Sequence, residues 1–318
     1  MKKPTENNTL GFDTFIAIDW SGAKGRYDGI AVAKCNAGRS APCLVTPMAS
    51  RWTRSEIVNW ICRQLDGKQR LLIGLDFAFG FPFEGQDVGY LGGRAKQLDS
   101  VFSLWELIEE KCCVDPDFGC TTFIEDPVYA SLFWKSGPLP EAWVERKRRT
   151  ELACVEATQT RPETVYKLIG SKQVGKSSVT GIRVLNQIRS AKKECVSFWP
   201  FDEVRGSAIV EIYPTLFRKS GTGSVAKLRS QDLKTALAVF GSDSMHRSRS
   251  GDLSDHETDA LISAAGLRSL ARIPATWSHP ELASPRVQRE GWILGVGGSN
   301  CQTLPSDLPY FLGSAKAI

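Results

Sequence analysis

The sequence predicts an α/β protein built on one mixed β-sheet. Two apolar runs, at residues 15–18 and 71–75, contain no polar residue, which is typical of strands buried on both faces of a sheet. Later apolar runs alternate with segments of helical periodicity, so helices should cover the sheet. The 318 residues are enough for one large domain or two small ones.

The first part of the chain reads as three strands, a helix and a fourth strand. The expected strands cover residues 15–18, 29–33, 44–48 and 71–75. A glycine-bearing turn at 20–25 joins the first two strands into a hairpin. Thr53 and Glu56 have the spacing of a capping box, which predicts a helix start there. Because the fourth strand follows this helix, we expect it to run parallel to a neighbour.

The remaining elements complete a β-β-β-α-β-α-β-α core in a domain at residues 12–296. Between the fourth and fifth core strands, residues 83–165 are interpreted as a helical insertion. We expect helices near 98–108, 141–154, 179–188, 230–240 and 252–272, and strands at 165–169, 196–199, 208–212 and 291–296. Residues 1–11 are expected to be a flexible N-terminus and 297–318 a loosely ordered tail.

Composition excludes some classes of protein. The chain has 42% hydrophobic and 24% charged residues, and no apolar run reaches 18 residues, so no membrane span is expected. The polar N-terminus lacks the apolar core of a secretory signal, which favours a cytoplasmic protein. The nine scattered cysteines are an odd number, which favours free thiols over disulfides.

Positive charge is concentrated in one stretch. Residues 141–195 carry twelve Lys or Arg against six Glu and no Asp, a net charge of +6, whereas the whole chain has +5. Such a stretch suits nucleic acid, and Arg146, Arg148 and Arg149 are candidate phosphate contacts. A solvated helix face would explain the same charges.

Two aspartates each follow a buried strand directly. Asp19 and Asp76 come after the first and fourth apolar runs, and sites in α/β sheets form at the carboxyl ends of strands. If these strands are parallel neighbours, the two carboxylates repel each other, and a divalent cation relieves that repulsion. The alternative is that each Asp only caps the turn after its strand.

Three further residues extend this candidate site. Glu211 lies inside an apolar strand, where a buried carboxylate needs a partner or a metal, although an edge strand could expose it. Asp259 lies one turn inside the last long helix, on the same face as Asp255 and His256. Helix capping explains Asp255 well but does not explain Asp259.

The order of these acids resembles the RuvC-type branch of the ribonuclease H-like superfamily. The chain most closely resembles a predicted-nuclease family catalogued as domain of unknown function 429. The matching segments are residues 17–22, 73–82, 174–182, 199–202, 210–214, 255–260 and 290–293. The resemblance implies a ribonuclease H-like fold with carboxylates at Asp19, Asp76, Glu211 and Asp259. It covers nearly the whole chain except residues 83–165.

A second motif points to a different chemistry. Residues 170–177 match GxxxxGKS, the pattern of a loop whose backbone amides, lysine and serine bind phosphates. An expected strand precedes it and an expected helix follows. No good second acidic strand follows, which argues against an ATPase. In a milder role, Lys172 or Lys176 would contact a substrate phosphate.

The leading functional hypothesis is a metal-dependent nuclease. Asp19, Asp76, Glu211 and Asp259 would hold Mg²⁺ or Mn²⁺ for phosphodiester hydrolysis, and His256 would join them or transfer a proton. The alternatives are a nucleotide-binding phosphotransferase of the actin-like kind, or an ATPase that uses the GxxxxGKS loop. The third alternative is a non-catalytic binding module on the same fold. The sequence distinguishes neither DNA from RNA nor one oligomeric state from another.

Overall fold

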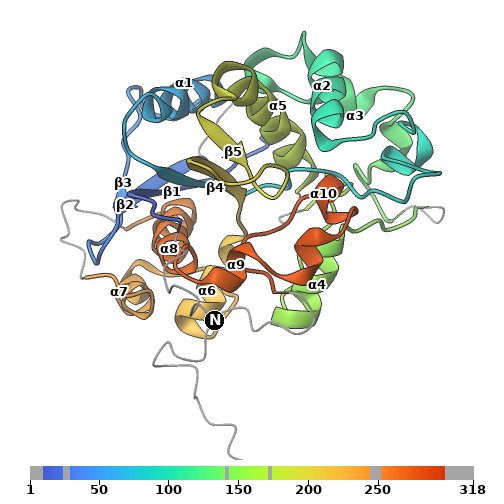
Figure 1. Ribbon diagram of the computed structural model, residues 1–318. Coiled ribbons are helices and arrows are strands. Elements are labelled where there is room, and N and C mark those ends of the chain that lie inside the picture. Colours follow the sequence, from blue (N-terminus) through green and yellow to red (C-terminus); the bar gives the residue numbers. More distant parts are fainter. Residues whose placement is uncertain (1–9, 24–28, 140–142, 171–173, 244–251, 298–318) are drawn as a thin grey trace, which may run out of the picture.

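The computed structural model describes residues 10–23, 29–139, 143–170, 174–243 and 252–297. A six-stranded mixed sheet lies between two layers of helices (Figure 1). The strands are β1 (Thr14–Asp19), β2 (Ala31–Asn36), β3 (Cys43–Leu44), β4 (Leu71–Leu75), β5 (Val196–Phe198) and β6 (Ser207–Glu211). The predicted α/β class with a mixed sheet is confirmed, as is the β-β-β-α-β order at its start.

The strands lie in the order β3-β2-β1-β4-β6-β5. The first three form antiparallel pairs, whereas β4 pairs with β1 and β6 in parallel, and β5 pairs with β6 in parallel. The parallel direction of β4 follows from the helix that precedes it. In this register Ile18 lies beside Leu75, and Leu75 beside Glu211.

Ten α-helices surround the sheet. They are α1 (Arg54–Leu65), α2 (Val101–Cys112), α3 (Thr121–Glu125), α4 (Arg149–Thr158), α5 (Gly175–Lys192), α6 (Pro214–Thr222), α7 (Ser230–Val239), α8 (Asp255–Leu270), α9 (Pro274–Trp277) and α10 (Val287–Glu290) among the described residues. Short 3-10 turns lie at Leu91–Gly93, Pro116–Phe118, Ala130–Leu132 and Pro280–Ala283. Helices α1, α2 and α5 cover one face of the sheet, and α6, α7 and α8 lie on the other (Figure 1).

Each face of the sheet contributes to its own hydrophobic core. Ile16, Ile18 and Ile73 pack toward α1 and α5, whereas Ala17 and Leu72 pack toward α8. This division follows from the alternation of side chains along a strand, which sends successive residues to opposite faces. It also decides which carboxylates at the strand ends can meet.

Two helices begin at capping boxes. Thr53 Oγ1 accepts a hydrogen bond from Glu56 N, and the Glu56 carboxylate accepts from Thr53 N, which starts α1 as predicted. Ser254 and Glu257 make the same reciprocal pair at the start of α8. The second pair fixes the N-terminal turns of α8, from which His256 and Asp259 project.

The region at residues 83–165 contains α2, α3 and α4 and has no separate core. The buried apolar side chains of α2 and α3 join the cluster formed with α1, α5 and one face of the sheet, whereas Ala153 and Cys154 of α4 belong to the cluster on the α8 side. The helix predicted at 141–154 begins only at Arg149, because Arg148 is the N-cap residue and its backbone N–H donates to Glu151 Oε2 at 2.7 Å. The segment before it is extended.

Two predicted strands are wrong. Residues 165–169 form a turn with one bridge between Lys167 and Trp134, and residues 291–296 form one bridge between Ile293 and Glu211. The apolar side chains of both segments are largely buried under other elements. Their apolar runs therefore reflect packing and do not indicate β-strands. Gly291 and Gly295, with φ of 85° and 88°, also interrupt any extended run in the second segment.

Parts of three predictions lie outside the described residues. These are the N-terminus up to residue 9, Lys172 in the GxxxxGKS loop, and the tail from residue 298. Within the described ranges, no helix has the length and apolar character that crossing a membrane requires.

We expect Gly266→Ala in α8 to destabilise the fold by about 1–3 kcal/mol, because a Cβ there would lie 2.1 Å from the Phe217 ring of α6. Alanine favours a helix by about 1 kcal/mol over glycine, and the overlap with the ring should outweigh this gain. Urea denaturation measures the change. Gly206→Ala is the control because nothing lies within 4 Å of its Cβ position, and equal stability of the two variants would contradict this packing.

Candidate active site

Asp19 and Asp76 lie side by side at the carboxyl edge of the sheet. Asp19 is the last residue of β1, and Asp76 directly follows β4, with its backbone N–H donating to Ile18 O at 3.1 Å. Because β1 and β4 are parallel and in register, both side chains point to the face that α8 covers. The sheet therefore brings together the two carboxylates that the sequence placed at strand ends.

Helix α8 adds Asp259 and His256 to this pair. His256 Nδ1 lies 2.6 Å from Asp19 Oδ2 in a hydrogen bond. This bond raises the pKa of His256, while burial raises the pKa of Asp19 and the His256 contact opposes that rise. Asp259 is buried and close enough to raise the pKa of Asp19 further by charge repulsion. The histidine is held by its Nδ1, and among the described residues no hydrogen bond is made by its other ring nitrogen.

Asp259 is already neutralised by two cations. Arg218 of α6 donates from Nη1 to Asp259 Oδ1 at 2.5 Å, and Lys227 donates from Nζ to Oδ2 at 2.6 Å. Arg218 is buried, whereas half of the Lys227 side chain is exposed. Sequence reasoning missed both residues, because Lys227 lies in a loop without periodicity and Arg218 interrupts the apolar face of a short helix.

Asp76 differs from the other acidic residues of the cluster in its contacts. Among the described residues, no hydrogen bond or ion pair reaches its side chain. Its pKa is raised well above the ordinary value by burial first, and then by the charges of Asp19 and Asp259. Ionising a carboxyl in this position costs free energy, because the charge is buried and close to other negative charges. A bound cation would remove this cost.

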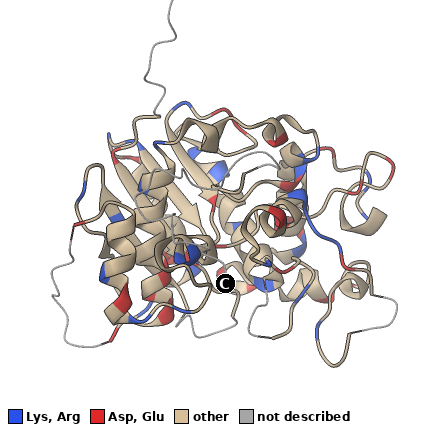
Figure 2. Cartoon of the chain, turned by 90° about the horizontal axis from the view of Figure 1, so that it is seen from below, with Lys and Arg blue, Asp and Glu red and all other residues tan. Residues whose placement is uncertain are grey.

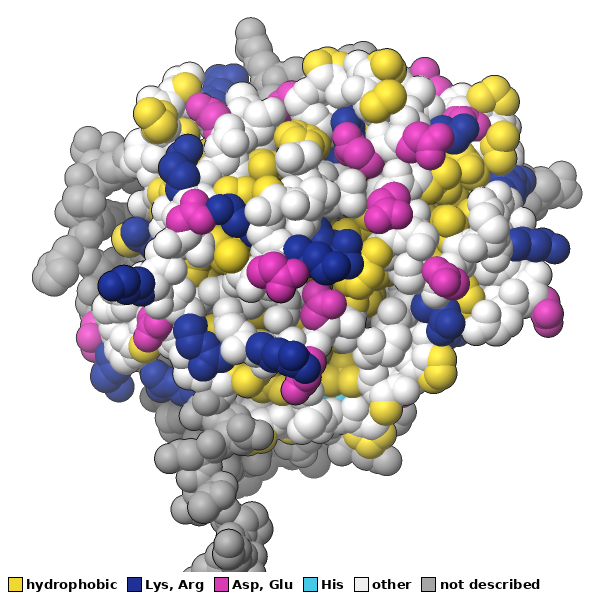
Figure 3. Space-filling view, turned by 45° about the horizontal axis from the view of Figure 1, so that its top comes forward, with side chains coloured by type: hydrophobic (Ala, Val, Ile, Leu, Met, Phe, Trp, Pro, Cys, Tyr) yellow, Lys and Arg dark blue, Asp and Glu magenta, His cyan; other side chains and the backbone are white. Residues whose placement is uncertain are grey.

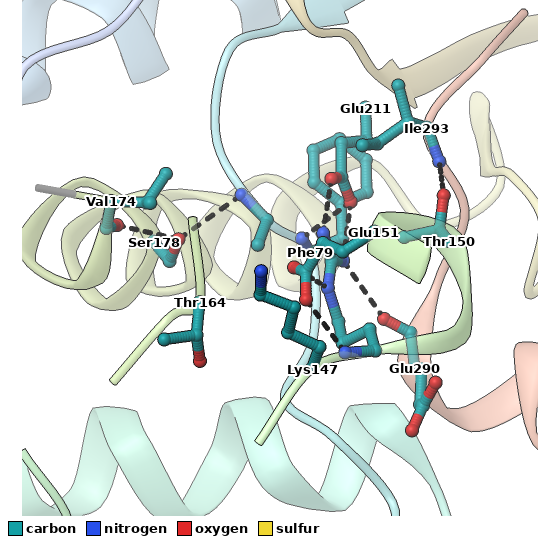
Figure 4. A network of polar contacts seen from close by, with 12 residues as sticks. Phe79, Lys147, Thr150, Glu151, Thr164, Val174, Ser178, Glu211, Glu290 and Ile293 are labelled. Carbon is teal, nitrogen blue, oxygen red and sulfur yellow. Dashed lines mark hydrogen bonds and ion pairs between the residues drawn. The ribbon is translucent and has the colours of Figure 1, made fainter. Parts of the chain in front are cut away.

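Glu211 does not belong to this cluster. Its register partner is Leu75, one residue before Asp76, so its side chain points to the opposite face of the sheet. There it forms a two-bonded ion pair with Arg148, at 2.6 and 2.8 Å. It also accepts from Phe79 N at 3.0 Å (Figure 4). The prediction that Glu211 joins the metal-binding carboxylates is wrong, because its two oxygens are taken by these donors.

The three arginines proposed as phosphate contacts are paired with glutamates. Arg148 is buried between Glu211 and Glu151, and Arg149 pairs with Glu281 and Glu156. Arg146 pairs with Glu84. A guanidinium buried in two ion pairs is not available to a backbone phosphate, so the prediction is wrong for Arg148. The Arg149 side chain is 21% exposed, and phosphate contact by it stays a prediction.

Charge on the surface is mixed in sign. In Figure 2, Lys and Arg positions are interspersed with Asp and Glu positions along the chain. On the face seen in Figure 3, Lys and Arg side chains lie among Asp and Glu side chains and do not gather into one large basic patch. The positive stretch of the sequence at 141–195 is thus divided among local ion pairs in the fold. Net charge in a stretch of sequence did not predict a basic patch.

The GxxxxGKS segment lacks the strand that a P-loop requires, because residues 165–169 form a turn. Its last residues begin α5 and pack against the turn after β1, where a Cβ on Gly22 would lie 2.3 Å from Ser177 N. Only glycine permits this approach. The motif therefore has a packing role beside the carboxylate cluster, and phosphate contact by Lys176 stays a prediction.

These residues fit a two-carboxylate cation site and do not fit a four-carboxylate cage. Within the described ranges, no three His, Cys, Asp or Glu side chains form a group that could hold a metal ion. Asp19 Oδ1 and the Asp76 carboxylate have no partner there, whereas each oxygen of Asp259 and Glu211 already accepts a hydrogen bond from a cationic side chain. Mg²⁺ is commonly held by one or two carboxylates together with water and substrate oxygens, which is the donor set present here.

Comparisons with known proteins leave the family open. No family model matches the chain, and no curated protein or solved structure matches it. The resemblance to the predicted-nuclease family therefore stays a prediction, and the geometry of the site carries the functional argument.

The Glu151 carboxyl gives the fold a pH dependence. Burial raises its pKa from 4.5 to about 7, although Arg148 opposes the rise. Since the folded state holds this proton more tightly, the stability it contributes is present below pH 4.5 and is lost as pH rises to about 7. Between pH 4.5 and 7, we expect the free energy of unfolding to fall by about 3 kcal/mol more in wild type than in Glu151→Gln, as measured by urea denaturation. Parallel pH profiles of the two proteins would contradict this assignment.

Proposed function

We propose that this chain is a metal-dependent nuclease that uses Asp19 and Asp76 to hold Mg²⁺ or Mn²⁺. The observation that carries the proposal is the adjacency of these two carboxylates at the ends of parallel strands, with that of Asp76 unpaired among the described residues. The mixed sheet, in the element order that the resemblance implies, supports a ribonuclease H-like fold.

The bound metal would activate a water molecule and stabilise the leaving oxygen of a phosphodiester. Asp19 holds His256 by its Nδ1, so the other ring nitrogen is positioned to carry a proton to or from the reacting oxygens. The raised pKa of His256 favours its protonated form, which suits proton donation to the leaving group. Arg218 and Lys227 hold the Asp259 carboxylate in place beside the pair.

A hollow of about 280 Å³ beside His256 supports substrate access to this site. It lies between the start of α8, strand β2 and the loop before α1, and its lining includes His256, Ser254, Thr46 and Arg51. Its polar lining suits a substrate with hydrogen-bonding groups, such as a nucleotide.

The test combines calorimetric titration of Mn²⁺ with a cleavage screen on single- and double-stranded DNA and RNA. We expect wild type to bind Mn²⁺ and to cleave at least one substrate, and Asp19→Asn to do neither. Asp232→Asn is the control, because this exposed carboxylate on α7 pairs only with Arg229 among described residues. Metal binding without cleavage would favour a phosphotransferase, and absence of binding would leave a non-catalytic module.

A further inference from the structure

The hollow beside His256 lies one strand away from the carboxylate pair. Its volume is about 280 Å³, and its lining includes residues 30–32 of the β2 segment and residues 44–47 that follow them in the sheet. Ala31 pairs with Asp19 in the antiparallel register of β2 and β1, and the Cα atoms of such a pair lie about 5 Å apart. Since His256 also bonds to Asp19, the hollow and the carboxylate pair are parts of one continuous site.

Pro47 accounts for the presence of this hollow. Strand β3 ends at Leu44, and the last bond of its ladder runs from Val45 N to Val32 O at 2.8 Å. The antiparallel register would place residue 47 opposite Ile30, and proline has no N–H to donate to the Ile30 oxygen. The chain therefore separates from β2 at this point, and the hollow lies between the two segments.

The lining of the hollow carries polar groups that are open to a ligand. Among the described residues, no hydrogen bond is made by the backbone oxygen of Ile30 or by the hydroxyls of Thr46 and Ser50. Thr46 and Ser50 are exposed, so their hydroxyls can both donate to a ligand and accept from it. Val32 and Trp52 add apolar surface beside these groups.

This combination of groups fits a nucleobase. The edge of a base presents hydrogen-bond donors and acceptors, and its two faces are flat and apolar. A base inside a duplex has its pairing edge occupied and its faces stacked, so it enters a pocket of this kind only after it leaves the duplex. A hollow that takes a base therefore selects an unpaired nucleotide.

We propose that this hollow binds the base of an unpaired nucleotide whose phosphate lies at Asp19 and Asp76. The substrate is then a single-stranded nucleic acid or an unpaired end of a longer one. This inference deepens the proposed function and rests on it. It adds Thr46 and Ser50 as substrate contacts, which no sequence motif marked.

The first test compares AMP and UMP with ribose 5-phosphate, which lacks the base. Affinities come from the rise in thermal midpoint with ligand concentration, measured in Mn²⁺ and again in EDTA, so that cleavage is not required. We expect the tighter of the two nucleotides to bind wild type roughly tenfold more strongly than ribose 5-phosphate, because it adds hydrogen bonds to the base. Equal affinities in both conditions would overturn the base subsite.

The Thr46→Leu/Ser50→Leu double variant removes both hydroxyls and adds apolar bulk to the hollow. We expect it to bind the nucleotide roughly tenfold more weakly than wild type, with its affinities for ribose 5-phosphate and Mn²⁺ unchanged. Ser278→Leu is the matched control, because Ser278 is exposed and lines a separate hollow of about 500 Å³ beside Trp199, which follows the opposite edge strand β5. Wild-type nucleotide affinity in the double variant would contradict the assignment.

Cleavage rates in Mn²⁺ then test the substrate class. Wild type should cleave a single strand at least tenfold faster than the same strand in a blunt duplex, and the double variant should lose this preference. Faster cleavage of the duplex by wild type would overturn the substrate class. If Mn²⁺ binds but neither form is cleaved, the nuclease proposal fails, and the comparison of nucleotides with ribose 5-phosphate still decides whether the hollow binds a base.

Discussion

Asp76→Asn should abolish metal-dependent cleavage without destabilising the protein. A catalytic metal supplies several kcal/mol of charge stabilisation, and each 1.36 kcal/mol is a factor of ten, so we expect a loss of about a thousandfold in rate. Stability should not fall, because the Asp76 carboxylate has no partner among the described residues and its pKa is raised well above normal by burial and then by Asp19 and Asp259.

The pH dependence of stability gives this prediction a second measurement. A carboxyl whose pKa is raised by folding contributes stability below its unfolded pKa and loses it as pH rises toward the folded pKa. In EDTA, the thermal midpoint of Asp76→Asn should therefore equal that of wild type near pH 4 and lie at or above it at pH 8. A midpoint several degrees lower at pH 8 would show that the carboxylate is a structural cap.

Much of the sheet could be predicted because burial on both faces leaves a simple sequence signal. The apolar runs ending at Asp19 and Asp76 became β1 and β4, and their parallel pairing followed from the intervening helix. The same signal failed at residues 165–169 and 291–296. Those segments are buried by packing under neighbouring elements, and an apolar run does not distinguish a buried turn from a buried strand.

The candidate site was predictable to the extent that it depends on strand ends. Asp19, Asp76, Asp259 and His256 come together because β1, β4 and α8 do. Glu211 failed because its position within β6 sets its face, and that face is known only from the register with Leu75. Its partner Arg148 is distant in sequence, so only the fold could reveal that the carboxylate was already paired.

Arg148→Met should be the most destabilising single substitution in the polar network. Arg148 is buried and donates to Glu151, to both oxygens of Glu211 and to the backbone oxygen of Glu290. Its removal leaves two buried carboxylates without a counter-charge, and breaking such a pair typically costs about 3–5 kcal/mol. Urea denaturation at pH 7 measures the loss. The Arg205 side chain is 82% exposed and pairs with Glu203. Arg205→Met should therefore change stability by less than about 0.5 kcal/mol.

The Glu211→Gln variant tests whether Glu211 stabilises the fold or binds the metal ion. The carboxylate of Glu211 lies on the opposite face of the sheet from Asp19 and Asp76, so its neutralisation should weaken the tie to Arg148 and leave Mn²⁺ affinity unchanged. Both quantities are measured at a temperature where the variant is fully folded. If folded Glu211→Gln loses Mn²⁺ binding while its stability is unchanged, Glu211 is a metal ligand after all. Loss of stability with normal binding would make Arg148–Glu211 the pair that docks the 83–165 region onto the sheet.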